Sequence, residues 1–177
     1  MSATEFDRGA NRLGALALRL TDRMQVAVTA DGARSPSAAA ALSTIERFFV
    51  DGPTIDDLRQ VLGLTSSGVV RLVDQLEAEG SVARERGEDG RVTVVTLTAQ
   101  GRRRAREVVD ARADVLVDAL AGLSRAERAT LARLVDKVLV GLVRAPSPGP
   151  AMCRWCATEV CGAARGQPCP VTRGALG

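Results

Sequence analysis

Apolar residues recur every three to four positions in the first third of the chain, the spacing of one face of an α-helix. The stretch from about 5 to 30 has leucine, methionine and valine on this spacing, with arginine and aspartate between them. It predicts an amphipathic helix. Ser35-Pro36 then places a capping hydroxyl before a proline, so a second helix is expected from there to about Phe49.

Two shorter helices follow, separated by a tight turn. Thr54 and Asp57 have the spacing of a capping box, which opens a helix. Gly63 allows the chain to turn, and Thr65 caps the next helix, which is expected to end near Gly80. Two short helices joined by a turn that contains glycine are typical of a helix-turn-helix, here at about 54–79.

The pattern then changes from helical to strand-like. Residues 81–86 and 91–98 are β-type runs around a glycine-rich turn, which predicts a hairpin at about 81–98. A long helix is expected from Thr98, and Ser124 with Glu127 forms a capping box for a last one. The proline-rich stretch 146–150 is expected to end that helix and to act as a linker. The predicted fold is mainly α with a small β-hairpin wing.

Composition excludes several classes of function. The chain of 177 residues has 46% apolar residues, 2% aromatic residues and no histidine. Without histidine no Ser-His-Asp or Cys-His group can form, and no nucleotide-cofactor fingerprint is present, so we do not expect an enzyme. A formal net charge of +3 permits nucleic-acid binding. No apolar run is long enough to span a bilayer, so a soluble cytoplasmic protein is expected.

One stretch resembles a known family. Asp89, Arg91, Leu97, Thr98 and Gly101 fit the D-x-R-x5-L-T-x2-G wing signature of the MarR family of winged-helix transcription regulators. The order of the predicted elements is similar to that family over about residues 10–144. The resemblance implies a winged helix-turn-helix protein that binds double-stranded DNA.

Short polar residues stand at the start of the second helix of the helix-turn-helix. A helix fits the major groove of DNA, and small side chains at its N-terminus let the backbone approach phosphates and base edges. Ser66 and Ser67 occupy that end, and Arg71 lies one turn further on. The resemblance implies that these three face DNA. Alternatively, the serines only cap the helix and Arg71 is a solvated surface charge.

The wing supplies a second candidate contact. Arg91 can enter the narrow, electronegative minor groove, and the resemblance implies that Asp89 holds its guanidinium in place. Alternatively, Asp89 forms the turn and Arg91 is a solvated charge on an edge strand. One or two further arginines are expected to touch phosphates, drawn from Arg84, Arg86, Arg102, Arg103, Arg104 and Arg106.

The terminal helices, at about 5–30 and 99–145, predict a homodimer. Their apolar faces are too wide to be buried on one small winged domain, so a second copy is expected to cover them. Residues 1–145 would then form the DNA-binding and dimerisation domain. Two recognition helices related by a two-fold axis predict an operator with an inverted repeat.

The remaining segment, 146–177, contains all four cysteines of the chain: Cys153, Cys156, Cys161 and Cys169. Four thiolates at C-x2-C-x4-C-x7-C spacing can hold either zinc or an iron-sulfur cluster. Only the first pair is C-x2-C, and a proline follows Cys169, which favours the cluster; a thiol/disulfide switch is the third option. Trp155, between the first two cysteines, is expected to pack the tail onto the body.

Together these features predict a homodimeric transcription regulator, a repressor, whose operator affinity responds to redox or iron state through the cysteine tail. The alternative is a regulator that responds to a small hydrophobic effector and whose tail is a structural zinc site. An electron-transfer protein is the remote alternative.

Overall fold

The computed structural model describes residues 3–30, 35–87, 92–143, 149–157, 169 and 171. The elements in chain order are α1 (Ala3–Ala30), α2 (Pro36–Phe48), α3 (Ile55–Leu62), α4 (Ser66–Ala78), β1 (Val82–Arg86), β2 (Thr93–Leu97), α5 (Ala99–Ala119), α6 (Arg125–Leu142) and α7 (Gly149–Cys153). β1 and β2 form an antiparallel two-stranded sheet. The predicted fold class, mainly α with a small hairpin, is confirmed.

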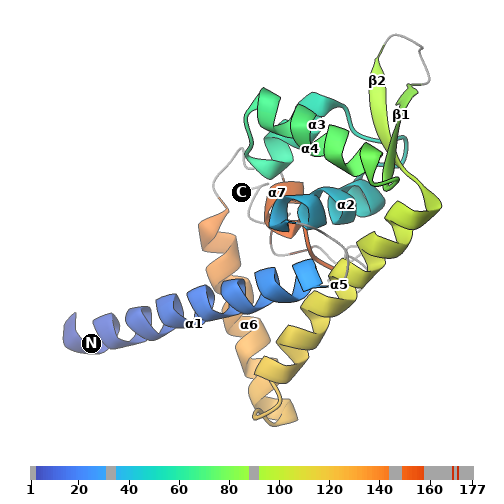
Figure 1. Cartoon of the computed structure of the whole chain (residues 1–177). Helices are drawn as coiled ribbons and strands as arrows, with labels where there is room; N and C mark the ends of the chain where they lie inside the picture. Colours follow the sequence, from blue (N-terminus) through green and yellow to red (C-terminus); the bar gives the residue numbers. More distant parts are fainter. Residues whose placement is uncertain are drawn as a thin grey trace.

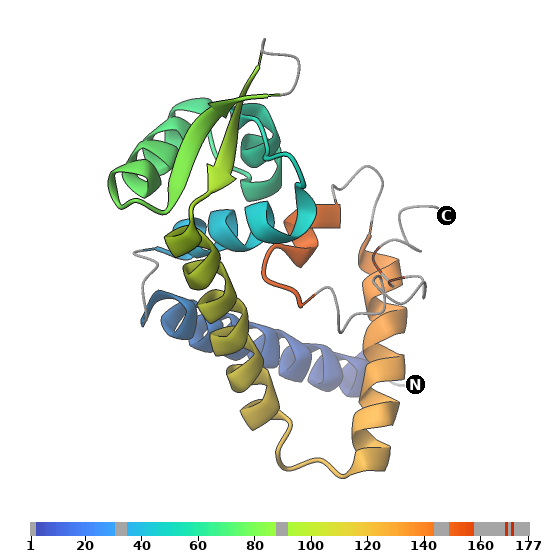
Figure 2. The same ribbon diagram turned by 90° about the vertical axis from the view of Figure 1, so that its right-hand side faces the viewer.

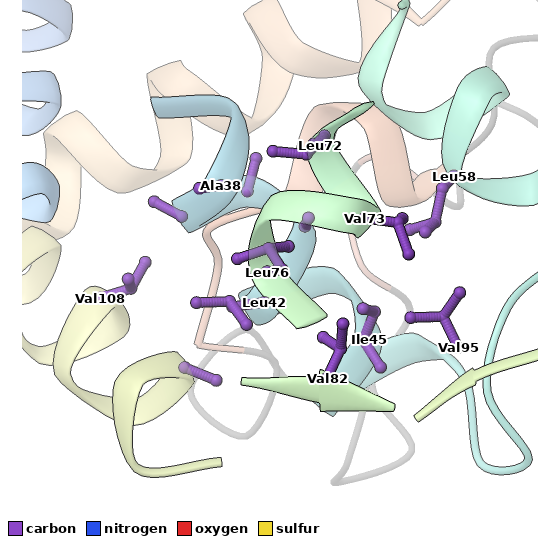
Figure 3. Close-up of a cluster of buried hydrophobic side chains, with 14 of the residues drawn as sticks. Ala38, Leu42, Ile45, Leu58, Leu72, Val73, Leu76, Val82, Val95 and Val108 are labelled. Atoms are coloured by element: carbon purple, nitrogen blue, oxygen red, sulfur yellow. The ribbon is translucent and has the colours of Figure 1, made fainter. Parts of the chain in front are cut away.

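Helix α2 lies at the centre of the molecule. It contacts α1 and α5 on one side and α3, α4 and β2 on the other, and Figures 1 and 2 show it between these two groups. Residues 38–41 of α2 are all alanine and all buried, so neighbouring helices can approach it closely. Leu42 and Ile45 extend this surface into the core shown in Figure 3.

Local capping begins the helix-turn-helix where the sequence predicts it. The Thr54 hydroxyl accepts a hydrogen bond from the Asp57 amide at 3.1 Å, and the Asp57 carboxylate accepts one from the Thr54 amide at 2.9 Å. Gly63 follows α3 with a positive φ of 64°, a conformation that glycine adopts without steric cost. The Thr65 hydroxyl then accepts from the Gly68 amide at 3.2 Å and begins α4.

The hairpin is joined tightly to α5. Thr98 caps α5, and its hydroxyl also lies 2.7 Å from the carbonyl oxygen of Gly80, to which it donates. A Cβ atom on Gly101 would lie 1.9 Å from the carbonyl oxygen of Ser81, a separation that no side chain tolerates. Glycine is therefore required at position 101 because α5 crosses the chain at the end of α4 in direct contact.

The outer helices differ from this closed unit. No residue of α6 is buried, and in α1 only Val28 is buried among the residues whose side chains are described. Figure 2 shows α6 running beside the body after the turn that follows α5. Within the described ranges, no helix is long and apolar enough to cross a membrane.

One helix was not predicted. Gly149 and Pro150, interpreted from sequence as part of a proline-rich linker, belong to α7. Proline is compatible with the first turn of a helix because the amide of that position needs no intrahelical acceptor. Helix α7 packs against α3, and Trp155 joins the main core. The expectation that Trp155 fixes the tail to the body is confirmed.

Candidate DNA-binding surface and cysteine site

The N-terminal turn of α4 presents the three predicted recognition residues to solvent. Ser66, Ser67 and Arg71 are all exposed. Arg71 Nε donates a hydrogen bond to the Ser67 carbonyl oxygen at 3.2 Å, so the arginine lies along the same face as the serines. The opposite face holds the helix in the core through Val69, Leu72, Val73 and Leu76. The surface therefore combines free helix amides, small side chains and one cation.

The two predicted wing residues, Asp89 and Arg91, lie outside the described residues, and their roles stay predictions. The described part of the hairpin runs to Gly87, whose amide donates to the Val92 carbonyl oxygen at 2.8 Å. In the middle of β2 the Val95 amide donates to the Pro53 carbonyl oxygen at 2.9 Å, which ties the wing to the start of the helix-turn-helix.

Two arginines of the predicted phosphate-binding set, Arg84 and Arg104, form ion pairs within the protein. Arg84 of β1 pairs with Asp74 and Glu77 of α4. The hydrogen bond with Asp74 is the main reason that the pKa of Arg84 is raised above its usual value. These contacts fix the wing relative to the recognition helix. The acidic pair at positions 74 and 77, on one helical face, is the sequence signal that could have indicated such an ion pair.

Arg104 has a similar role at the start of α5. Its Nη1 atom lies 3.3 Å from a carboxylate oxygen of Glu79 and 2.7 Å from the Ser81 hydroxyl. Arg102 Nη1 donates to the Leu97 carbonyl oxygen at 2.7 Å. Arg86 and Arg103, in contrast, form no ion pair within the part of the chain that the structure describes. Arg106 is also exposed, with its Nε donating to the Arg102 carbonyl oxygen at 3.2 Å, so these three arginines stay available for phosphate.

A cavity of about 450 Å³ lies between the end of α2, the hairpin and the start of α5. Its lining is Ile45, Glu46, Phe49, Val50, Gly52, Glu85, Thr96, Leu97 and Arg102. Carboxylates and a guanidinium thus accompany the apolar groups of this cavity. Sequence reasoning did not locate it, because its walls come from separate segments that only the fold brings together.

At the end of α7, Cys153 and Cys156 lie next to each other. The Cys156 amide donates to the Cys153 carbonyl oxygen at 2.8 Å, and Arg112 of α5 lies with its Nη2 atom 3.9 Å from the Cys156 sulfur. A hydrogen bond from the Cys153 thiol, followed by the positive charges of Arg112 and Arg47, lowers the pKa of Cys156 to about 6, against the opposing effect of burial.

The other predicted ligands are placed in part. Cys169 is buried with Val143 and Val171, and Cys153 packs against this second cluster. Cys161 lies outside the described residues. Among the described residues no three Cys, Asp or Glu side chains converge as a metal centre. The four-cysteine centre therefore stays a prediction, although three of its sulfurs belong to one region.

The fold and the exposed face of α4 define a winged helix-turn-helix protein. A model of the MarR family matches residues 35–91, which span α2 to the wing. The helix-turn-helix of this chain and the first part of its wing are therefore similar to those of the MarR family. The match ends before α5, so it says nothing of the outer helices or of the cysteine tail.

One curated protein is also similar to part of this chain. The chain is 35% identical over 85 residues to YdgJ of Bacillus subtilis, an uncharacterised HTH-type transcriptional regulator. That match covers 48% of this chain and 52% of YdgJ, so the chain spans about half the length of this curated relative.

Solved structures share the fold over a longer range. A MarR family protein from Bacillus stearothermophilus superposes with a TM-score of 0.71 at 24% identity, over 81% of this chain and 99% of that one. MepR, a regulator of the Staphylococcus aureus multidrug efflux pump MepA, gives a TM-score of 0.65 at 16% identity, over 80% and 99%. At these identities the likeness establishes the fold alone.

Proposed function

We propose that the protein is a cytoplasmic, homodimeric transcription regulator, a repressor, that binds an inverted-repeat operator. The observation that carries this proposal is the N-terminal turn of α4. Ser66, Ser67 and Arg71 are exposed there on a helix whose other face is buried, as a helix that enters the major groove requires. Arg91 of the wing is the proposed minor-groove contact, with Asp89 as its partner.

The outer helices support the homodimer. Leu134, Val135 and Val138 of α6 are between 43% and 48% exposed, and Leu13 and Leu16 of α1 are more than half exposed. Such a surface is large for a monomer and is normally covered by a partner. A second copy related by a two-fold axis presents two α4 helices to half-sites about one helical turn apart.

Selection of operators from a random DNA library tests the proposal. The selected sequences are expected to form an inverted repeat. Arg71→Ala should weaken binding to that operator by about ten- to a hundredfold, the size of one lost base contact. Arg128→Ala is the matched control, because Arg128 lies at the start of α6 and donates to the Leu123 carbonyl oxygen at 3.0 Å. An equal loss for both variants would contradict the proposed surface.

The tail is proposed to hold an iron-sulfur cluster on Cys153, Cys156, Cys161 and Cys169. The chemistry of the donor set supports this, because four thiols bind such a cluster or zinc, and Arg112 offsets negative charge beside Cys156. When bound, the group supplies a response to redox or iron state. Anaerobic purification followed by iron, sulfide and zinc analysis tests it. A coloured protein with iron and sulfide is expected.

The alternative is a regulator that responds to a small hydrophobic effector and whose tail is a structural zinc site. The cavity of about 450 Å³ between α2, the hairpin and α5 has room for a small ligand, and Ile45, Phe49 and Leu97 supply apolar groups in its wall. The structure of Staphylococcus aureus MepR bound to ethidium bromide shares the fold of this chain with a TM-score of 0.54. A colourless protein with one zinc per chain, together with an operator affinity that an aromatic ligand lowers, would replace the cluster proposal.

A further inference from the structure

Trp155 connects the cysteine tail to the DNA-reading part of the molecule. Its side chain is only 9% exposed and belongs to the buried cluster formed by α2, α3, α4 and α5. Helix α7, which precedes it, contacts α3, and Figures 1 and 2 both show α7 beside α2. The part of the tail from 149 to 157 is therefore docked on the winged-helix unit.

The two described C-x2-C cysteines are in the same turn as this tryptophan. Cys153 and Cys156 flank Trp155 in sequence, and the Cys156 amide closes the turn on the Cys153 carbonyl oxygen at 2.8 Å. Arg112 of α5 reaches the Cys156 sulfur at 3.9 Å. Whatever binds both sulfurs must therefore also fix the backbone that carries the indole.

The docking of the indole is incomplete in one respect. Trp155 Nε1 is buried and has no hydrogen-bond partner within the described residues, which makes its burial less favourable. Arg154 covers the ring from outside, with its guanidinium carbon 5.4 Å from the ring centroid, but is itself exposed. An anchor of this kind gains from any constraint that lowers the entropy cost of ordering the turn.

We propose that Trp155 is the anchor through which the state of the cysteine site reaches the helix-turn-helix. With a metal on the cysteines, the turn at 153–156 is fixed and the indole is seated against the winged-helix unit. Without the metal, the turn is freer and the indole leaves the core more often. This rests on the proposed metal site in the tail. The route runs directly to α3 and α5, and does not require a movement of α6.

Intrinsic fluorescence tests the first half of the proposal. Trp155 is the only tryptophan and the chain has no tyrosine, so the emission of the protein reports this indole alone. Zn²⁺ serves as the probe, added to reduced protein stripped of metal with a chelator. Loaded protein should emit at shorter wavelength and resist acrylamide quenching, and stripped protein should be quenched more readily. Identical quenching in both states would overturn the proposal.

Operator affinity tests the second half. The dissociation constants of loaded and stripped wild-type protein should differ by at least about fivefold, the lower end of typical coupling between sites. Trp155→Ala should bind the same metal but reduce this ratio to below about twofold. Trp155→Phe keeps an aromatic ring without the unpartnered N–H and should retain most of the ratio. If Trp155→Ala does not fold, the quenching comparison of loaded and stripped wild-type protein remains decisive, because it needs no variant.

The possible failures can be told apart. No binding to any selected operator refutes the proposed regulator, and no metal bound refutes the proposed tail site. Equal operator dissociation constants for loaded and stripped wild-type protein refute sensing by the tail, and the anchor with it. A wild-type ratio that persists in full in folded Trp155→Ala protein refutes the anchor alone.

Discussion

Helix α2 is rich in alanine and helix α6 in leucine and valine, yet the two helices use these apolar residues in opposite ways. In α2 the run from Ala38 to Ile45 is buried inside its own chain. In α6 no residue is buried, and Val138 and Leu142 remain 48% and 64% exposed. Apolar content alone therefore does not separate a core helix from an interface helix. The difference lies in whether the neighbouring elements of the same chain cover the face.

The elements packed around α2, from α2 to α5, form an inner unit. This inner unit should tolerate substitutions less well than the outer helices α1 and α6. Gly101→Ala places a Cβ atom 1.9 Å from the Ser81 carbonyl oxygen, so backbone must move at the junction of α4, β1 and α5. We expect the free energy of unfolding to fall by about 3 kcal/mol or more. Urea denaturation followed by circular dichroism measures it.

Gly122→Ala is the matched control for this substitution. No atom lies within 4 Å of a Cβ placed there, and Gly122 is exposed in the turn between α5 and α6. A change within about 0.5 kcal/mol is expected for such a surface position. Similar losses for both variants would mean that the inner unit is no more tightly packed than the outer part.

A charge on the exposed apolar face of an outer helix should leave the monomer folded but should prevent dimerisation. Val138→Glu puts a carboxylate on the exposed apolar face of α6, and burying it unpaired against a second copy is costly. We expect a monomer whose operator affinity is lower by about a hundredfold or more, because only one half-site is held at a time. Analytical ultracentrifugation and fluorescence anisotropy measure the two effects.

Val50→Glu serves as the control for charge alone. Val50 is 100% exposed and lies in the loop between α2 and α3. The Val50→Glu variant should remain dimeric. If Val138→Glu also remained dimeric, the exposed face of α6 would need another explanation, and the contrast with α2 would lose its functional meaning.

Sequence predicted the features that depend on neighbours along the chain. The capping boxes of Thr54 with Asp57 and of Ser124 with Glu127 form as expected, because each needs only residues three positions apart. The pairing of Arg84 with Asp74 joins different elements and was missed, since the charge run alone indicated phosphate contacts. Ser66, Ser67 and Arg71 are exposed on α4, and their contact with DNA stays a prediction.

The tail shows where such reasoning ends. A string of prolines and glycines is typical of a linker, yet Gly149 and Pro150 begin α7, which docks on α3. This docking depends on a surface built from distant parts of the chain, which no local pattern reveals. The sequence did indicate that Trp155 packs on the body, because a single large aromatic residue between cysteines is seldom left in water.

The last expected effect concerns the boundary between the cysteine tail and the helices α2 and α5. The Cys153 thiol, then Arg112 and Arg47 of the inner unit, lower the pKa of Cys156 to about 6, whereas an unfolded chain has a cysteine pKa of about 8.5. Between these values the unfolded state binds a proton that the folded state does not. The contribution to stability therefore grows as pH rises from 6 to 8.5, by up to about 1.4 kcal/mol per pH unit, and is lost as pH falls through 6.

Urea denaturation of metal-free, reduced protein measures this contribution as the difference in free energy of unfolding between wild type and Cys156→Ser. The two stabilities should diverge as pH rises from 6 to 8.5 and should run parallel below 6. Cys153→Ala removes the hydrogen-bond donor that contributes most to the lowered pKa of Cys156, so the midpoint for alkylation of Cys156 by iodoacetamide should shift to higher pH. Parallel stability curves across the whole range would mean that α2 and α5 do not act on the tail thiol. The cysteine site would then be electrostatically independent of the helices that surround the DNA-reading unit.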